Sequence, residues 1–191
     1  MSSLLDNPAL RKSVLPISVE QYRHMGEAGV ISQRTELLRG VIFKKMNKSP
    51  LHVWTVRRLR SLIEGNLPDG YYLRQEEPLS FSHSEPEPDL AVVEGTDTDH
   101  RTEHPTTAVL VVEVAVTSKE IDREKASLYA EAGVPEYWLV LPEQKSISRF
   151  TEREGDRYTD TESVTYGSPA CGQDLVSHAL PAIQVELAEL A

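Results

Sequence analysis

The chain has 191 residues, of which 39% are hydrophobic, and its 20 basic and 30 acidic residues give a net charge of −10. This length predicts one domain with one core, and no run approaches the roughly 20 apolar residues that a membrane span needs. An acidic protein is a poor non-specific binder of nucleic acid, because attraction to phosphates supplies most of that affinity, although a local basic surface is not excluded.

Residues 1–15 mix charged and small side chains and lack the apolar core of a signal peptide. We expect them to form a flexible arm ahead of a single domain at residues 16–191. Cys171 is the only cysteine, so neither an intrachain disulfide nor a cysteine metal cluster can form. Together these features favour a cytoplasmic location.

The first part of the chain predicts a helix, a hairpin and a second helix. Ser18-Val-Glu-Gln21 is a capping box, which predicts a helix from Val19 to Ala28. Glu36–Met46 predicts a hairpin or a bulged strand that bends at Gly40. Ser49-Pro50 begins the second helix, because proline suits the first helical position. One face of that helix carries His52, Val56, Leu59 and Ile63.

The segment Ala108–Val116 is the most informative part of the sequence. Eight of its nine residues are apolar and β-branched residues dominate, which is typical of a strand buried on both faces. The ninth residue is Glu113, in the middle. An ionised carboxylate at such a place is costly unless a metal, a cation or hydrogen bonds compensate it.

A helix follows this strand and leads to another strand. Thr117–Glu120 is a capping box, and the helix is expected to end at Ala132 before Gly133. One stripe of it carries Ile121, Lys125, Leu128 and Ala132. Further strands are predicted at 71–75, 89–93, 136–141, 146–151, 157–161 and 183–187, with a loop at 95–105. The order predicts an α/β (α+β) fold, in which a mixed β-sheet with one parallel crossover is flanked by helices and extended by a β-hairpin towards the C-terminus.

Asp89 and Glu113 each lie on a short apolar strand, and they can converge if the two strands are neighbours. Two uncompensated carboxylates repel, and a hard divalent cation such as magnesium or manganese relieves that repulsion. Such an ion can polarise a phosphodiester and lower the pKa of a bound water. Lys125 should face the sheet, where it could orient the attacking water or stabilise charge on phosphate. Glu36 could add a third oxygen, and His52 could donate to a phosphate.

Each of these residues also has a purely structural interpretation. Glu113 and Lys125 could form a buried ion pair, or Lys125 could extend past its apolar neighbours to water. Asp89 could simply form a cap or a turn, and His52 could be a packing residue. Glu36 is as readily structural as functional.

Several segments, in order, are characteristic of a known family. The chain resembles the Uma-type family of putative restriction endonucleases, which belongs to the PD-(D/E)XK nuclease-like superfamily, from about Pro16 to about Tyr158. The segments that carry the resemblance are Ser18–Tyr22, Glu36–Ile42, Ser49–His52, Glu87–Val93, Val111–Ser118, Asp122–Lys125 and Tyr129–Trp138.

The resemblance implies a restriction-endonuclease-like core with a magnesium-dependent phosphodiester site. The Pro-Asp pair of the superfamily falls on Pro88-Asp89, and its second acid falls on Glu113. Its usual lysine, two residues after that acid, would fall at Ala115, so the resemblance implies that the lysine has moved to Lys125 on the next helix. Glu36 matches the acidic residue that superfamily members often supply from the first helix region.

The expected function is therefore that of a metal-dependent endonuclease acting on DNA, with magnesium or manganese held by Asp89 and Glu113 and with Lys125 and Glu36 as further catalytic residues. A catalytically inactive binding or assembly protein with the same fold is one alternative, and a phosphodiesterase acting on RNA or small nucleotides is another. A homodimer is expected, because nucleases that cut both strands commonly pair two sites.

Overall fold

The computed structural model describes residues 13–116, 119–167 and 174–191. Two compact units are present. One contains the described residues up to Lys45 together with Ser82–Glu85, and the other contains Met46–Phe81 and the described residues from Pro86 to Ala191. Most of the predicted N-terminal arm and the first two residues of the predicted Thr117–Glu120 capping box lie outside the described residues.

The smaller unit contains helix α2 (Val19–Glu27) and a hairpin of β1 (Thr35–Leu38) and β2 (Val41–Lys44). The predicted capping box is confirmed, because the Ser18 side chain accepts from the backbone of Gln21 and the Gln21 side chain accepts from the backbone of Ser18. The hairpin is also confirmed, and it turns through two residues of positive φ, Arg39 at 49° and Gly40 at 75°. Both values suit a tight turn between antiparallel strands.

The larger unit is built on one six-stranded mixed sheet, whose strand order is β3-β4-β5-β6-β7-β8. Only β5 and β6 pair in parallel, and all other neighbours are antiparallel. The predicted crossover is confirmed, since a parallel pair requires a connection over one face of the sheet. The strands are β3 (Tyr71–Gln75), β4 (Leu90–Glu94), β5 (Leu110–Val114), β6 (Glu136–Leu141), β7 (Ser146–Glu154) and β8 (Arg157–Thr165).

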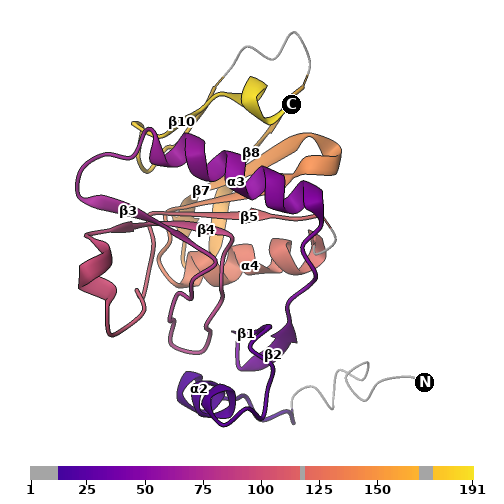
Figure 1. Cartoon of the computed structure of the whole chain (residues 1–191), viewed down its shortest axis with the longest axis vertical. Coiled ribbons are helices and arrows are strands. Elements are labelled where there is room, and N and C mark those ends of the chain that lie inside the picture. Colours follow the sequence, from indigo (N-terminus) through magenta and orange to yellow (C-terminus); the bar gives the residue numbers. More distant parts are fainter. Residues whose placement is uncertain (1–12, 117–118, 168–173) are drawn as a thin grey trace. The chain divides into compact units, whose positions relative to one another are not determined.

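Two helices cover opposite faces of this sheet, as Figure 1 shows: α3 (Pro50–Glu64) on one side and α4 (Lys119–Glu131) on the other. The Ser49-Pro50 start is confirmed, because Ser49 accepts a hydrogen bond from the backbone of His52 and proline occupies the first turn. No helix among the described residues is both long enough and apolar enough to cross a membrane.

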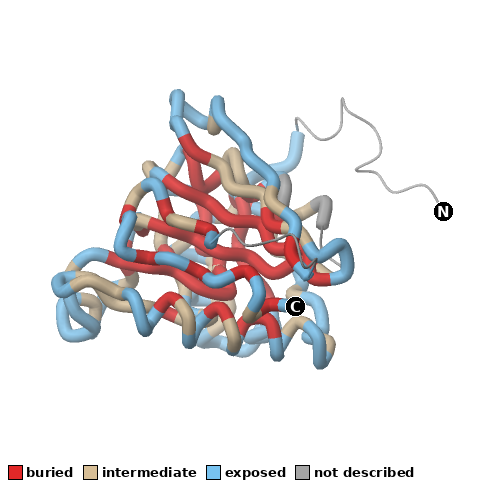
Figure 2. Tube along the Cα trace, turned by 90° about the horizontal axis from the view of Figure 1, so that it is seen from above, coloured by how far each residue is buried: buried red, intermediate tan, exposed pale blue. Residues whose placement is uncertain are grey.

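Residues alternate between the two faces along the central strands, which are buried except for Glu94 at the end of β4. Leu110, Val112 and Val114 belong to the same core cluster as the buried side chains of α3. Because side chains alternate along a strand, Glu113 points to the other face, which α4 covers. In Figure 2 buried residues follow the extended segments inside the molecule, and exposed residues surround them.

The structure differs from the sequence-based prediction at several places. Strand β4 begins at Leu90, so Asp89 immediately precedes the strand that was predicted at 89–93. In the β7–β8 hairpin, β7 continues to Glu154 at the turn instead of ending at 151, and β8 continues to Thr165 instead of ending at 161. The segment 95–105, predicted as a loop, contains a short 3₁₀ helix at Asp97–His100. The expected strand at 183–187 is only β10 (Gln184–Val185), which pairs with the unpredicted β9 (Leu175–Val176) and leads to a 3₁₀ helix at Leu187–Leu190.

Candidate active site

The structure brings Asp89 and Glu113 together. The antiparallel register pairs Leu90 with Val112, so the next step along both strands places Asp89 opposite Glu113. The backbone N–H of Asp89 donates to Oε2 of Glu113 at 3.4 Å, and the N–H of Val114 donates to Oδ2 of Asp89 at 2.7 Å. Both acids are buried, with 8% and 4% of their surface exposed.

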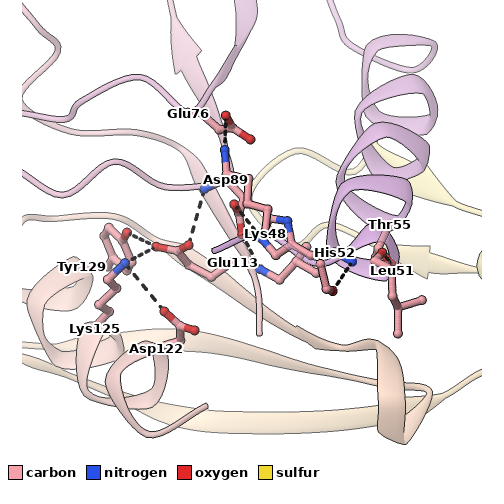
Figure 3. Close-up of polar contacts among 12 residues, drawn as sticks. Lys48, Leu51, His52, Thr55, Glu76, Asp89, Glu113, Asp122, Lys125 and Tyr129 are labelled. Carbon is pink, nitrogen blue, oxygen red and sulfur yellow. Dashed lines mark hydrogen bonds and ion pairs between the residues drawn. The ribbon is translucent and has the colours of Figure 1, made fainter. Parts of the chain in front are cut away.

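Lys125 joins the acids from α4, as Figure 3 shows. Its Nζ donates to Oε1 of Glu113 at 3.0 Å and lies 3.6 Å from Oδ1 of Asp122. The hydroxyl of Tyr129 donates to the same Oε1 of Glu113 at 2.7 Å. One carboxylate oxygen therefore accepts from an ammonium and from a phenol, which compensates its charge in the interior.

No pattern in the sequence indicates a role for Asp122 or Tyr129. Both lie on the same helix face as Lys125, three residues before it and four residues after it, and both are buried. That spacing is the signal that could have found them, because residues three and four apart are neighbours on a helix surface. Leu128, which sequence analysis did place on the inward stripe, is buried as expected.

His52 contacts the other acid from the first turn of α3. Its Nε2 lies 3.1 Å from Oδ1 and 3.2 Å from Oδ2 of Asp89, and its side chain is 13% exposed. Since a carboxylate only accepts, Nε2 carries the proton in this contact. Nδ1 is buried and has no hydrogen-bond partner among the described residues. His52 therefore holds Asp89, while its expected role at a substrate phosphate stays a prediction.

A second pair of charged residues adjoins Asp89. Lys48 forms an ion pair with Glu76, and their side chains are 35% and 30% exposed. The N–H of Glu76 donates to the carbonyl oxygens of Pro88 at 3.1 Å and of Asp89 at 3.2 Å. Glu76 has a left-handed backbone, with φ 56°, which is uncommon for a residue other than glycine. No sequence pattern singled out this pair, because Lys48 precedes α3 and Glu76 follows β3, and the two residues meet only in the folded chain.

Glu36 and Ala115 complete the set of predicted positions. Glu36 is buried on β1 of the smaller unit, opposite Phe43, rather than on a helix. The other predicted residues lie in the larger unit, so the assistance expected from Glu36 stays a prediction. Ala115, where the superfamily would place its lysine, is fully buried, and its N–H donates to the carbonyl of Val140 at 2.8 Å.

The acids also influence a buried phenol beneath α4. Burial, and next the negative charge of Glu113, raise the pKa of Tyr137 well above its ordinary value. Its hydroxyl therefore stays protonated and donates to the backbone carbonyl of Asp122 at 2.8 Å. This bond ties β6 to the part of α4 that carries Lys125.

The two carboxylates are compatible with a magnesium ion that keeps several of its waters, rather than with an ion whose ligands all come from the protein. Asp89, directly before β4, and Glu113, on the adjacent β5, carry hard carboxylate oxygens. Among the described residues, no group of three or more His, Cys, Asp and Glu is arranged to hold a metal ion. Magnesium commonly takes only one or two carboxylates and completes its shell with waters and substrate phosphates. Two converging acids are therefore compatible with such a site.

Comparisons with known proteins agree with this fold. A crystal structure of a "putative nuclease belonging to DUF820" from Anabaena variabilis superposes with a TM-score of 0.74 at 13% sequence identity, covering 92% of this chain and 97% of that one. At that identity the likeness shows the fold alone. A search of curated proteins gave no match.

The family model of Uma2, described as "Putative restriction endonuclease", matches residues 19–187, which include every residue of the site described above. The chain therefore belongs to the Uma2 family.

Proposed function

We propose that this protein is a magnesium-dependent endonuclease that hydrolyses phosphodiester bonds of DNA. The observation that carries the proposal is the convergence of Asp89 and Glu113 from adjacent strands, with Lys125 at 3.0 Å from Glu113. Membership of the Uma2 family supports the nuclease class.

Asp89 and Glu113 would hold the ion, which when bound supplies Lewis-acid activation of the phosphodiester and of a water. The N–H of Val114 and the imidazole of His52 orient the Asp89 carboxylate. Lys125 stabilises negative charge next to Glu113, where a charged hydrogen-bond donor in a buried site acts more strongly than in water.

The test is cleavage of supercoiled plasmid by the purified chain with magnesium. We expect Asp89→Asn, Glu113→Gln and Lys125→Met each to lower the rate at least 100-fold, as removal of a charged group at a reaction centre commonly does. Glu154→Gln is the matched control, because Glu154 lies in an exposed ion pair on the β7–β8 hairpin. Cleavage that persists in the Asp89 and Glu113 variants would overturn the assignment of the site.

The observation that favours a non-catalytic role is the closed set of contacts around Glu113, which is typical of a buried structural ion pair. Calorimetric titration with magnesium or manganese distinguishes a catalytic metal site from a structural ion pair. A catalytic site binds magnesium or manganese saturably and loses that binding in Glu113→Gln, whereas a structural pair binds neither ion. The same preparation assayed on RNA decides between DNA and RNA as substrate, and sedimentation tests the expected dimer.

A further inference from the structure

We propose that Lys48 binds a phosphate of the nucleic-acid substrate beside the acids, and that Glu76 holds Lys48 in place until the substrate displaces it. This rests on the proposed function and deepens it by naming a residue that contacts the substrate. Lys48 immediately precedes Ser49, the N-cap of α3, and Figure 3 shows its side chain extending to Glu76, next to Asp89.

Accessibility separates Lys48 from Lys125. Lys125 is only 5% exposed, and its ammonium already contacts Glu113 and Asp122. Lys48 is 35% exposed and its ion pair with Glu76 lies at the surface. Surface ion pairs are weak because water screens them, so a phosphate can replace the carboxylate of Glu76 at little cost. Lys48 is therefore the lysine of this group that an approaching strand meets.

The position of Lys48 is fixed relative to the acids from two sides. On one side, Glu76 donates through its backbone to the carbonyl of Asp89 at 3.2 Å. On the other, the helix that begins right after Lys48 and Ser49 carries His52, which contacts the Asp89 carboxylate at 3.1 Å. The left-handed backbone of Glu76 is a conformation that folded proteins retain mainly where surrounding contacts enforce it, often at functional sites.

Charge gives the reason for a cation at this place. Asp89, Glu113 and Glu76 would repel a polyanion, and the chain as a whole carries −10. Residues 46–65 have the opposite balance, with four basic residues and one acidic residue. A local basic segment beside an acidic site attracts phosphate even when the net charge is negative. Lys48 is the member of this segment that lies next to Asp89.

The experiment measures binding separately from cleavage. A fluorescein-labelled 20-base-pair duplex is titrated with the chain in EDTA, and anisotropy gives Kd at several salt concentrations. Lys48→Ala should weaken binding several-fold and reduce the slope of log K against log salt by about 1, because one phosphate contact is lost. Lys48→Arg should retain both. Glu76→Gln should instead tighten binding, because it frees Lys48 and removes a repelling charge.

If Lys48 contacts the substrate, Lys48→Ala raises Kd and Glu76→Gln lowers it. If Lys48 and Glu76 form only a structural pair, both variants lower the melting temperature and leave Kd unchanged. The matched control is the exposed pair of Arg157 and Glu154, whose variants Arg157→Ala and Glu154→Gln should leave Kd unchanged. An unchanged salt slope in Lys48→Ala, a loss of affinity in Glu76→Gln, or no binding of the duplex at all would overturn the inference. Plasmid cleavage by the Asp89 and Glu113 variants decides the proposed function separately. Cleavage lost in those variants but unaffected by Lys48→Ala would refute only the role of Lys48.

Discussion

Replacing Lys125 by methionine should be among the most destabilising single changes in the larger unit. At 3.0 Å, the attraction between Nζ and Oε1 of Glu113 is roughly 5.5 kcal/mol for an effective dielectric constant of about 20. Much of this is offset by the desolvation of both charges. Removing one partner, however, leaves Glu113 buried beside Asp89 without its cation. We therefore expect Lys125→Met to lower the free energy of unfolding by about 3–5 kcal/mol.

Replacing Glu113 by glutamine should lower the free energy of unfolding by less than Lys125→Met does. In Glu113→Gln the amide oxygen can still accept from Tyr129, and Lys125 keeps the carboxylate of Asp122 at 3.6 Å. We expect a loss of about 1–3 kcal/mol, the range for a weakened buried hydrogen bond. The double variant should be more stable than Lys125→Met alone, because the uncompensated negative charge is gone.

Urea unfolding followed by circular dichroism at neutral pH measures all three free energies. Arg157→Ala, which breaks an exposed ion pair, is the control and should change stability by no more than about 0.5 kcal/mol. A free energy of unfolding of Lys125→Met within that range of the wild type would refute the stabilising role of the ion pair. This role is also refuted if the double variant loses the sum of both single losses, since additivity means that the two groups do not interact.

Three further predictions concern other parts of the chain. Burial raises the pKa of Tyr137, so the Tyr137 hydroxyl loses its proton at a lower pH in the unfolded chain than in the folded one, and the free energy of unfolding falls as pH rises above about 10. Tyr137→Phe should reduce this pH dependence by up to about 1.4 kcal/mol per pH unit, measured by urea unfolding at alkaline pH. Ser177→Ala removes a donor 2.6 Å from the buried Glu136 carboxylate and should cost about 1–3 kcal/mol in the same unfolding assay at neutral pH. Gly40→Ala should lower the melting temperature, because φ is +75° and a Cβ would clash with the side chain of Pro16. Gly26→Ala is the control and should not lower it, because a Cβ there meets nothing within 4 Å.

Elements with a strong pattern were predictable from the sequence. The run 136–141 is strand β6 with the same bounds, and the α3 stripe of Val56, Leu59 and Ile63 is buried as expected. Both elements are long enough to show a hydrophobic pattern, and the prediction of secondary structure from sequence depends on such a pattern. β9 and β10 have two residues each and show no period, so their pairing could not be seen.

The site was predictable only in part, for a related reason. Asp89 and Glu113 stood out because charged residues in apolar strands must be compensated. Tyr129 was missed because a tyrosine on an apolar helix face is an ordinary packing residue, and only its hydroxyl at 2.7 Å from Glu113 distinguishes it. The ion pair of Lys48 and Glu76 joins two surface residues with no shared pattern, and only the pairing of β3 with β4 brings Glu76 to Asp89.

The lysine and the acid that it contacts belong to different secondary-structure elements, 12 residues apart along the chain. On a single strand, two such groups would be held at a nearly constant separation by the backbone between them. Here the separation depends on how closely α4 packs on the sheet, and therefore on the size of two buried side chains, Leu128 of α4 and Tyr137 of β6. Conservative changes at those two positions offer a way to adjust the distance between Lys125 and Glu113 in small increments.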